Sequence, residues 1–74
     1  MNTKDLLGKE IFDVNAKRIG KVSDIDFDMQ QEVITHIVVK AGLTKKYGIT
    51  LDKIDKIGDK IILKIGEDQL RGKP

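Results

Sequence analysis

The sequence predicts an all-β fold, a small single β-barrel of about five to six short strands with one short helical turn. Eleven of the 74 residues are Ile, and this stiff, β-branched residue favours strands over helices. Apolar and polar residues alternate with a period of two far more often than they repeat at helical spacing. Glycines also divide the chain into short segments typical of a barrel or meander; they are Gly8, Gly20, Gly42, Gly48, Gly58 and Gly66.

The chain length allows one domain, residues 1–74, with a core over about 6–65 and a flexible C-terminal tail over 66–74. A domain of this size buries only about 60% of its unfolded surface, so its stability is marginal without extra support. Cysteine is absent and His36 is the single histidine, so disulfides, thiolate metal sites and histidine clusters are excluded. Self-association or unusually good packing remains.

The first third of the chain predicts two strands joined by a turn. The strands cover residues 9–14 and 17–28, and Asn15 is expected to take the left-handed conformation in the Asn15-Ala16 turn. In the second strand, Val22 falls on the same side as the aspartates 24, 26 and 28, while Ile25 and Phe27 fall on the other. Burying Val22 with carboxylates would be costly, so a bulge near Ser23 is expected. Gly20 is expected to mark a point of close packing.

The next strand, residues 32–40, is apolar on both faces. Val33, Ile37 and Val39 fall on one side, and Ile34, His36 and Val38 fall on the other. Because one face alone can look into a small barrel, the other must be covered by the rest of the domain or by a partner. The sequence therefore predicts that Ile34, His36 and Val38, together with Ile62, form an interface.

The second half predicts two further strands around one helical turn. Residues 42–46 form a loop and residues 47–51 a strand. Asp52 is expected to cap a turn that carries Ile54 and that Gly58 closes. The last strand, 59–65, is expected to point Ile61, Leu63 and Ile65 inward and Ile62 outward.

The charge distribution is lopsided. The net charge is +2, with five basic and seven acidic side chains in residues 1–37 and nine basic and five acidic ones in residues 38–74. Such polarity can steer an acidic partner. No apolar run approaches the ~20 residues of a membrane span, and the N-terminal residues lack a signal-peptide core, so a cytoplasmic location is expected.

The inventory for catalysis is thin. A nucleophilic hydroxyl would come from Ser23 or a threonine, with His36 as the base, and nothing in their spacing brings them together. There is no phosphate-binding loop motif. The sequence predicts no enzyme, no cofactor and no metal.

Three alternating carboxylates, Asp24, Asp26 and Asp28, form an acidic stripe on the second strand. They resemble the start of a calcium loop, but such a loop needs a Gly at its sixth and a Glu at its twelfth position, which here are Met29 and Thr35. Carboxylates that alternate along a strand lie about 6.5–7 Å apart, too far to ligate one ion together. The stripe is therefore interpreted as a solvated or partner-facing surface.

Lys40, Lys45 and Lys46 frame a basic loop beside Tyr47. Basic residues near an aromatic ring are typical of nucleic-acid binding. Tyr47 is the only nearby aromatic residue, arginine is scarce and aspartates interrupt the basic run, so this surface supports nucleic acid as the weaker hypothesis.

Two stretches, Leu7-Gly8-Lys9-Glu10-Ile11-Phe12-Asp13 and Arg18-Ile19-Gly20-Lys21-Val22-Ser23-Asp24-Ile25-Asp26-Phe27-Asp28, resemble the opening of a PRC-barrel domain. The later Ile49-x-Leu51, Ile54, Ile57-Gly58-Asp59 and Ile61-Ile62-Leu63 are similar to its closing half. The turn Asn15-Ala16 departs from the Asp/Asn-Gly that the family commonly has there. The resemblance covers residues 6 to about 65.

The resemblance implies a binding module without catalytic residues. Small archaeal proteins with a single PRC barrel act as adaptors, often as dimers, including at the cell-division machinery, and a related domain in a ribosome-maturation factor binds a ribosomal protein. The leading hypothesis is thus a protein–protein adaptor that is expected to form a homodimer. The alternative is an RNA- or ribosome-associated factor that uses the basic C-terminal half, and a purely structural homo-oligomer stays open.

Overall fold

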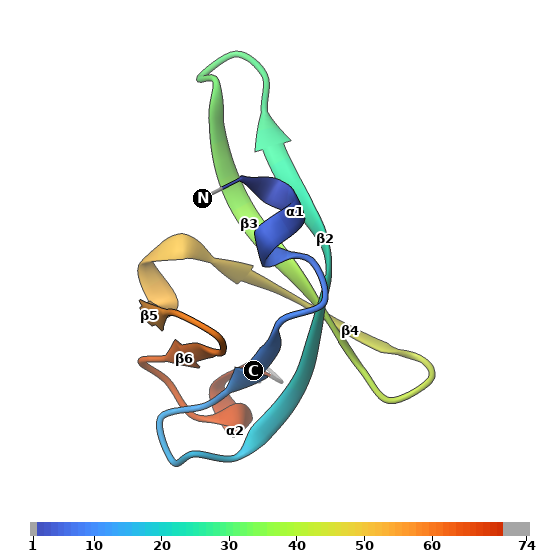
Figure 1. Cartoon of the computed structure of the whole chain (residues 1–74), viewed down its shortest axis with the longest axis vertical. Helices are drawn as coiled ribbons and strands as arrows, with labels where there is room; N and C mark the ends of the chain where they lie inside the picture. Colours follow the sequence, from blue (N-terminus) through green and yellow to red (C-terminus); the bar gives the residue numbers. More distant parts are fainter. Residues whose placement is uncertain (1, 71–74) are drawn as a thin grey trace.

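The computed structural model describes residues 2–70, which form one curled six-stranded sheet in the order β4-β3-β2-β1-β6-β5 (Figure 1). All pairs are antiparallel except β1 with β6, which is parallel. The predicted all-β barrel is confirmed, with two helical turns at its ends that the sequence did not predict. The elements are α1 (Thr3–Leu6), β1 (Glu10–Phe12), β2 (Arg18–Asp28), β3 (Val33–Ala41), β4 (Lys45–Thr50), η1 (Leu51–Lys53), β5 (Ile54–Ile57), β6 (Ile61–Leu63) and α2 (Glu67–Leu70).

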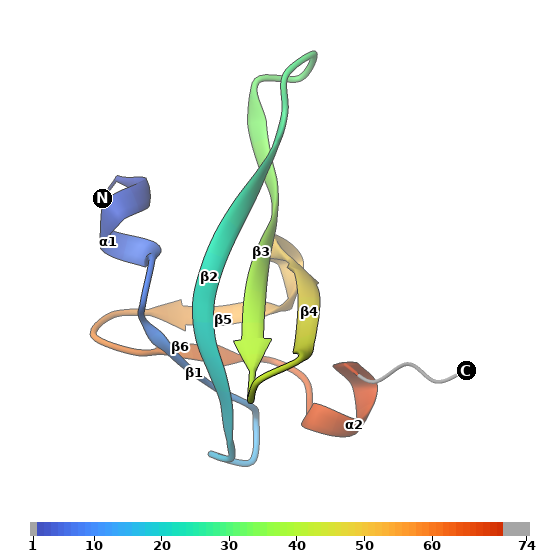
Figure 2. The same ribbon diagram turned by 90° about the vertical axis from the view of Figure 1, so that its right-hand side faces the viewer.

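The β2–β3 hairpin is longer than the rest of the sheet, and its end projects as an arm. β4 pairs with β3 from His36 to Ala41, and β1 pairs with β2 from Arg18 to Lys21. Residues 26–35, called the arm below, therefore form a two-stranded ribbon beyond the strands that pair with β1 and β4, and its outer part stands clear of β5 and β6 in both views (Figure 2).

Two extra residues set which side chains of the hairpin face inward. The register moves from Val22↔Val39 to Asp24↔Val38, so Ser23 is bulged, as predicted. A second shift, from Asp26↔His36 to Phe27↔Ile34, leaves Thr35 as an extra residue in β3. Because each bulge reverses the alternation, the prediction that Ile34 shares a face with His36 and Val38 is wrong.

The core is built almost entirely of β-branched and Leu side chains from the concave face of the sheet. Across β2, β3 and β4 they stand in rows, one of which joins Ile25, Ile37 and Ile49. The buried set comprises Leu6, Ile11, Ile19, Val22, Ile37, Val39, Ile49, Ile61 and Leu63. Ile61 and Leu63 thus face inward as predicted, and Ile65 packs against the cluster.

Asp13 is a buried carboxylate, 2% exposed, that holds the N-terminal turn and the C-terminal helix together. Its oxygens accept the backbone N–H groups of Asn15 at 2.8 Å, Lys17 at 2.9 Å and Glu67 at 2.9 Å. Within the predicted tail, residues 67–70 form α2, whose Leu70 packs against the core. The rest of that tail lies outside the described residues.

Three local predictions are wrong in detail. The left-handed residue of the first turn is Ala16, with φ 65°, and not Asn15, because Asn15 uses its N–H to bind Asp13. Thr50 precedes the helical turn and its hydroxyl donates to Asp52, which lies inside η1. Ile54 begins β5 and does not belong to the turn.

The helices of residues 2–70 are all too short and too polar to cross a membrane.

Gly20 of β2 packs directly against the backbone of Lys40 and Ala41 in β3. A Cβ on this residue would stand 2.2 Å from the backbone oxygen of Lys40. We expect Gly20→Ala to lower the free energy of unfolding by about 1–3 kcal/mol, because backbone must move to relieve the clash. Urea unfolding tests this against Gly58→Ala, whose Cβ meets nothing within 4 Å and should change stability by less than about 1 kcal/mol. Equal effects of the two variants would contradict the close packing.

Ala16 occupies a backbone conformation that suits glycine better. A left-handed conformation costs a residue with a Cβ about 1–2 kcal/mol, while glycine gives back about 0.5–1 kcal/mol through its freer unfolded chain. We expect Ala16→Gly to raise the free energy of unfolding by up to about 1 kcal/mol. Ala41→Gly, in β3, is the control and should lower it; a loss of stability in both would refute the strain at Ala16.

Asp13 should make stability depend on pH. The N–H of Lys17 does most to lower the pKa of Asp13, those of Glu67 and Asn15 act in the same direction, and burial opposes them. A lowered folded-state pKa stabilises the fold above the unfolded value of about 3.9, and this contribution is lost as the pH falls through the folded-state pKa.

The measurement is urea unfolding of Asp13→Asn and the wild type between pH 7 and pH 3. We expect the variant to be less stable at pH 7 and the difference to shrink below about pH 4. Asp59→Asn, at an exposed carboxylate, controls for the loss of one charge. A difference that stays constant over this range would contradict the role of the ionised Asp13.

Candidate protein-interaction surfaces

An apolar groove of about 520 Å³ opens on the concave side of the sheet. Four elements form it, namely α1, β3, η1 and β5. The residues that line it are Asn2, Leu6, Ile34, Ile37, Leu51, Ile54 and Ile57. Six of these seven are Leu or Ile, so the groove offers apolar contacts with almost no polar group to orient a small ligand.

The groove exists because the sheet does not close. β4 and β5 stand at the two ends of the strand order and are joined through η1. The side chains at this opening keep much of their surface in contact with solvent: Leu51 is 43% and Ile57 is 41% exposed. Several large apolar side chains that gather at one opening are typical of a surface that binds another protein.

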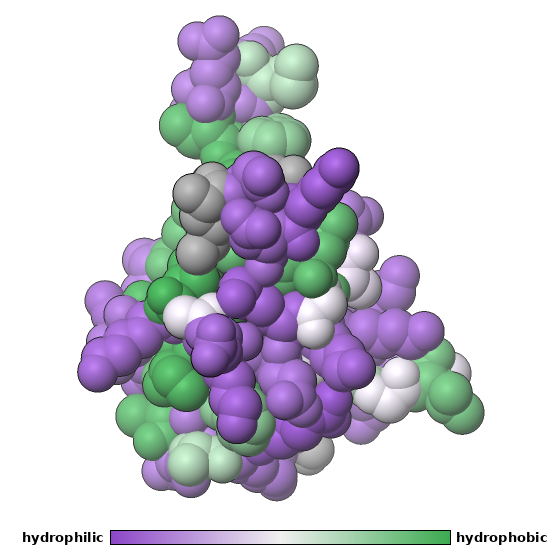
Figure 3. All heavy atoms as spheres, viewed as in Figure 1, coloured by the Kyte–Doolittle hydropathy of each residue, from purple (hydrophilic) through white to green (hydrophobic). Residues whose placement is uncertain are grey.

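The apolar surface continues from the groove onto the arm. Phe27 lies opposite Ile34, which itself lines the groove, and Phe27 is 56% exposed. Met29 and Val33, at the end of the arm, are also exposed. Figure 3 shows hydrophobic side chains between hydrophilic ones on this projecting part.

On the opposite, convex face of the hairpin, the predicted acidic stripe meets part of the predicted interface. Asp24 lies directly opposite Val38, and Asp26 lies opposite His36. Both carboxylates are exposed, whereas His36 and Val38 are half-buried. The sequence treated these as two separate surfaces, but strand pairing makes them one, called the convex surface below.

Asp28 has a structural task at the end of the same stripe. Its Oδ1 accepts the N–H groups of Gln30 at 3.0 Å and Gln31 at 3.2 Å, which fixes the turn at the tip of the arm. Asp28 therefore belongs to the arm, and the convex surface consists of Asp24, Asp26, His36 and Val38.

The basic residues divide between the two faces of the sheet. Lys40 lies opposite both Lys21 and Lys46, so three lysines form a row across β2, β3 and β4. Lys45 is the neighbour of Lys46 on β4, and alternation points it the other way. Tyr47 lies opposite Val39 and packs against the core, not beside this row. Lys21 was missed because strand pairing, not sequence proximity, brings it to the other two.

Ile62, which was predicted to join the interface, belongs neither to the groove nor to the convex surface. It lies on β6, opposite Lys56 and beside Phe12 of β1, and β1 and β2 separate β6 from β3. Lys60 Nζ stands 5.0 Å from the centre of the Phe12 ring. Ile62 is half-buried and lies on a part of the sheet away from β3.

Two other carboxylates with a lowered pKa, Glu10 and Asp52, make local contacts. A hydrogen bond from Arg18 lowers the pKa of Glu10, across 2.7 Å between Nε and Oε2. A hydrogen bond from the Thr50 hydroxyl does the same for Asp52. Within residues 2–70, no three His, Asp or Glu side chains are grouped so that they could hold a metal ion.

The sequence was compared with models of protein families and with curated proteins. No curated protein matches this chain. The family model of the PRC-barrel domain matches residues 1–70 of the 74, which includes every strand described above. That family is a small β-barrel module compatible with a non-catalytic interaction role. The chain belongs to the PRC-barrel domain family.

Proposed function

We propose that this chain is a non-catalytic protein–protein interaction adaptor of the cytoplasm that acts as a homodimer. One observation carries the proposal: the β2–β3 hairpin presents two different surfaces, the apolar groove on its concave side and the convex surface on the other. An adaptor needs two such surfaces so that it can associate with itself and still bind a partner. The setting in archaeal cell division rests on the resemblance alone.

The energies favour association at the groove. Burying a few hundred Å² of apolar surface contributes several kcal/mol at about 25 cal/mol per Å². That is comparable with the whole stability that the core of so small a domain supplies, about 3–5 kcal/mol. Self-association is therefore a plausible source of the support that a 74-residue chain without cysteine needs.

The convex surface suits the protein partner. Val38 offers a partly buried apolar centre, with Asp24 and Asp26 on one side and the row of Lys21, Lys40 and Lys46 along the next positions. Such neighbouring charges of opposite sign select a partner with the complementary pattern. A nucleic acid would meet the aspartates beside the lysines, so RNA binding is the weaker candidate.

The test is capture from native extract by the immobilised protein, with and without nuclease. We expect a protein that survives nuclease treatment and that Val38→Asp releases, because a charge would enter the apolar centre of the contact. Val14→Asp is the matched control, since Val14 is 56% exposed and lies outside both surfaces. Capture that disappears with nuclease, and with Lys40→Glu plus Lys46→Glu, would favour RNA and overturn the adaptor.

A further inference from the structure

We propose that the groove of each copy holds the arm of a second copy, so that the dimer forms by reciprocal exchange of arms. This inference rests on the proposed function, because it describes how the adaptor associates with itself. Four features of the described chain support it.

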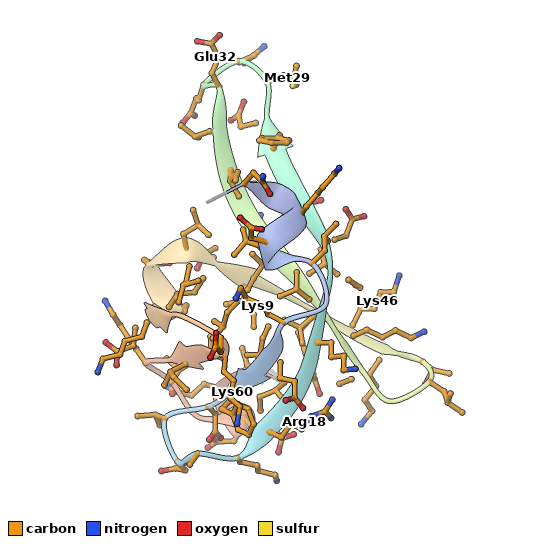
Figure 4. The ribbon with its side chains drawn as sticks, viewed as in Figure 1. Lys9, Arg18, Met29, Glu32, Lys46 and Lys60 are labelled. Carbon is orange, nitrogen blue, oxygen red and sulfur yellow. The ribbon has the colours of Figure 1, made fainter. Side chains whose placement is uncertain are left out.

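The first is that the chain exposes both halves of the contact. The groove leaves Leu51 and Ile57 more than two-fifths exposed, and the arm carries Phe27 at 56% and Met29 at 82% exposure. A groove of about 520 Å³ is within the range that encloses a drug-sized molecule, which is room for a few large side chains. Figure 4 shows Met29 at the end of the arm, away from the barrel body.

The second is charge. Residues 26–35 contain Asp26, Asp28 and Glu32 and no Lys or Arg, a formal charge of −3. Residues 51–57, which form the η1 and β5 wall of the groove, contain Asp52 and Asp55 against Lys53 and Lys56, a formal charge of zero, so this wall does not repel the acidic arm of a second copy. The outer part of the arm projects away from β5 and β6 of its own copy (Figures 1 and 2), so a second copy is needed to bring it to such a wall.

The third is the state of the arm itself. An isolated two-stranded ribbon is marginally stable in water and presents free strand edges. Glu32 also adopts a left-handed backbone, with φ 59°, at the arm's turn. A ribbon with such a turn and with an exposed Phe on its concave side is stabilised when a second molecule covers that side.

The fourth is symmetry. The arm and the groove share β3, since Ile34 and Ile37 line the groove and Val33, the first residue of β3, lies in the arm. When two copies lie antiparallel about a two-fold axis, each arm passes over the other copy's groove, and the same contact forms twice. A stable dimer buries about 800 Å² on each partner, about a sixth of the 5135 Å² surface of the described chain. Two equivalent contacts share this area.

The experiment measures dimer dissociation by analytical ultracentrifugation of the full chain. Phe27→Asp damages the arm and leaves the groove intact, while Leu51→Asp damages the groove and leaves the arm intact. We expect each variant alone to weaken the dimer at least tenfold, because both contacts are altered. Leu43→Asp, at a leucine that is 93% exposed in the β3–β4 turn, should leave the dissociation constant within a factor of two.

Mixing the two damaged variants tests the reciprocity. A mixed dimer regains one intact contact, between the Leu51→Asp arm and the Phe27→Asp groove, so the mixture should dimerise more tightly than either variant alone. A mixture no tighter than the separate variants overturns arm exchange. Circular dichroism of each variant confirms that the fold is kept, as expected at exposed positions.

A covalent test needs no loss of stability. The chain has no cysteine, so oxidation of mixed Met29→Cys and Leu51→Cys chains should link two molecules by a disulfide, and Leu43→Cys in place of Leu51→Cys should not. A wild type that dimerises but resists both substitutions and gives no such link refutes the arm exchange while the proposed adaptor stands. A wild type that stays monomeric at high concentration removes the homodimer, while capture of a partner through Val38 still tests the adaptor.

Discussion

The alternation of side chains along the β2–β3 hairpin depends on two extra residues, and the rest of the barrel depends on that alternation. Val22 and Ile25 are three positions apart, so in a regular strand they would point to opposite faces. The bulge at Ser23 lets both face the core. Thr35 does the same on β3 and moves Ile34 to the concave side. Without the bulge at Ser23, carboxylates would enter the barrel. Without the extra residue Thr35, the groove would lose Ile34 from its β3 wall.

Asp13 joins parts of the chain that strand pairing does not join. It accepts hydrogen bonds from the first turn and from the start of α2, 54 residues further on. The backbone of Val14 also donates to Ile65. A buried carboxylate is costly unless hydrogen-bond donors surround it, and here backbone N–H groups provide them. The chain after β6 is thereby held against the core.

A structural feature could be predicted from the sequence when it depends on residues close together in the chain, and not when it depends on residues that only the fold brings together. The bulge at Ser23 could be predicted because Val22 and the aspartates conflict within one strand. The close approach at Gly20 followed from glycine in a strand. Thr35 gave no such signal, because either face of β3 could hold its apolar residues. The groove was missed since Leu6, Ile34 and Leu51 come from distant segments, and the same holds for Lys21 beside Lys40. The contacts of the two tail residues Glu67 and Leu70 were missed because their partners, Asp13, Lys17 and the core, lie far away in the sequence.

Because the sheet does not close, the residues that stabilise the fold differ from the residues that surround its opening. The residues that keep the fold, such as Ile11, Ile37 and Ile61, are fully buried, whereas Leu51 and Ile57 at the opening remain substantially exposed. Substitutions at exposed positions usually change stability by less than about 0.5 kcal/mol, so the opening can accumulate changes that the core cannot. Duplicated copies of such a chain could therefore diverge in what they recognise while they keep one scaffold.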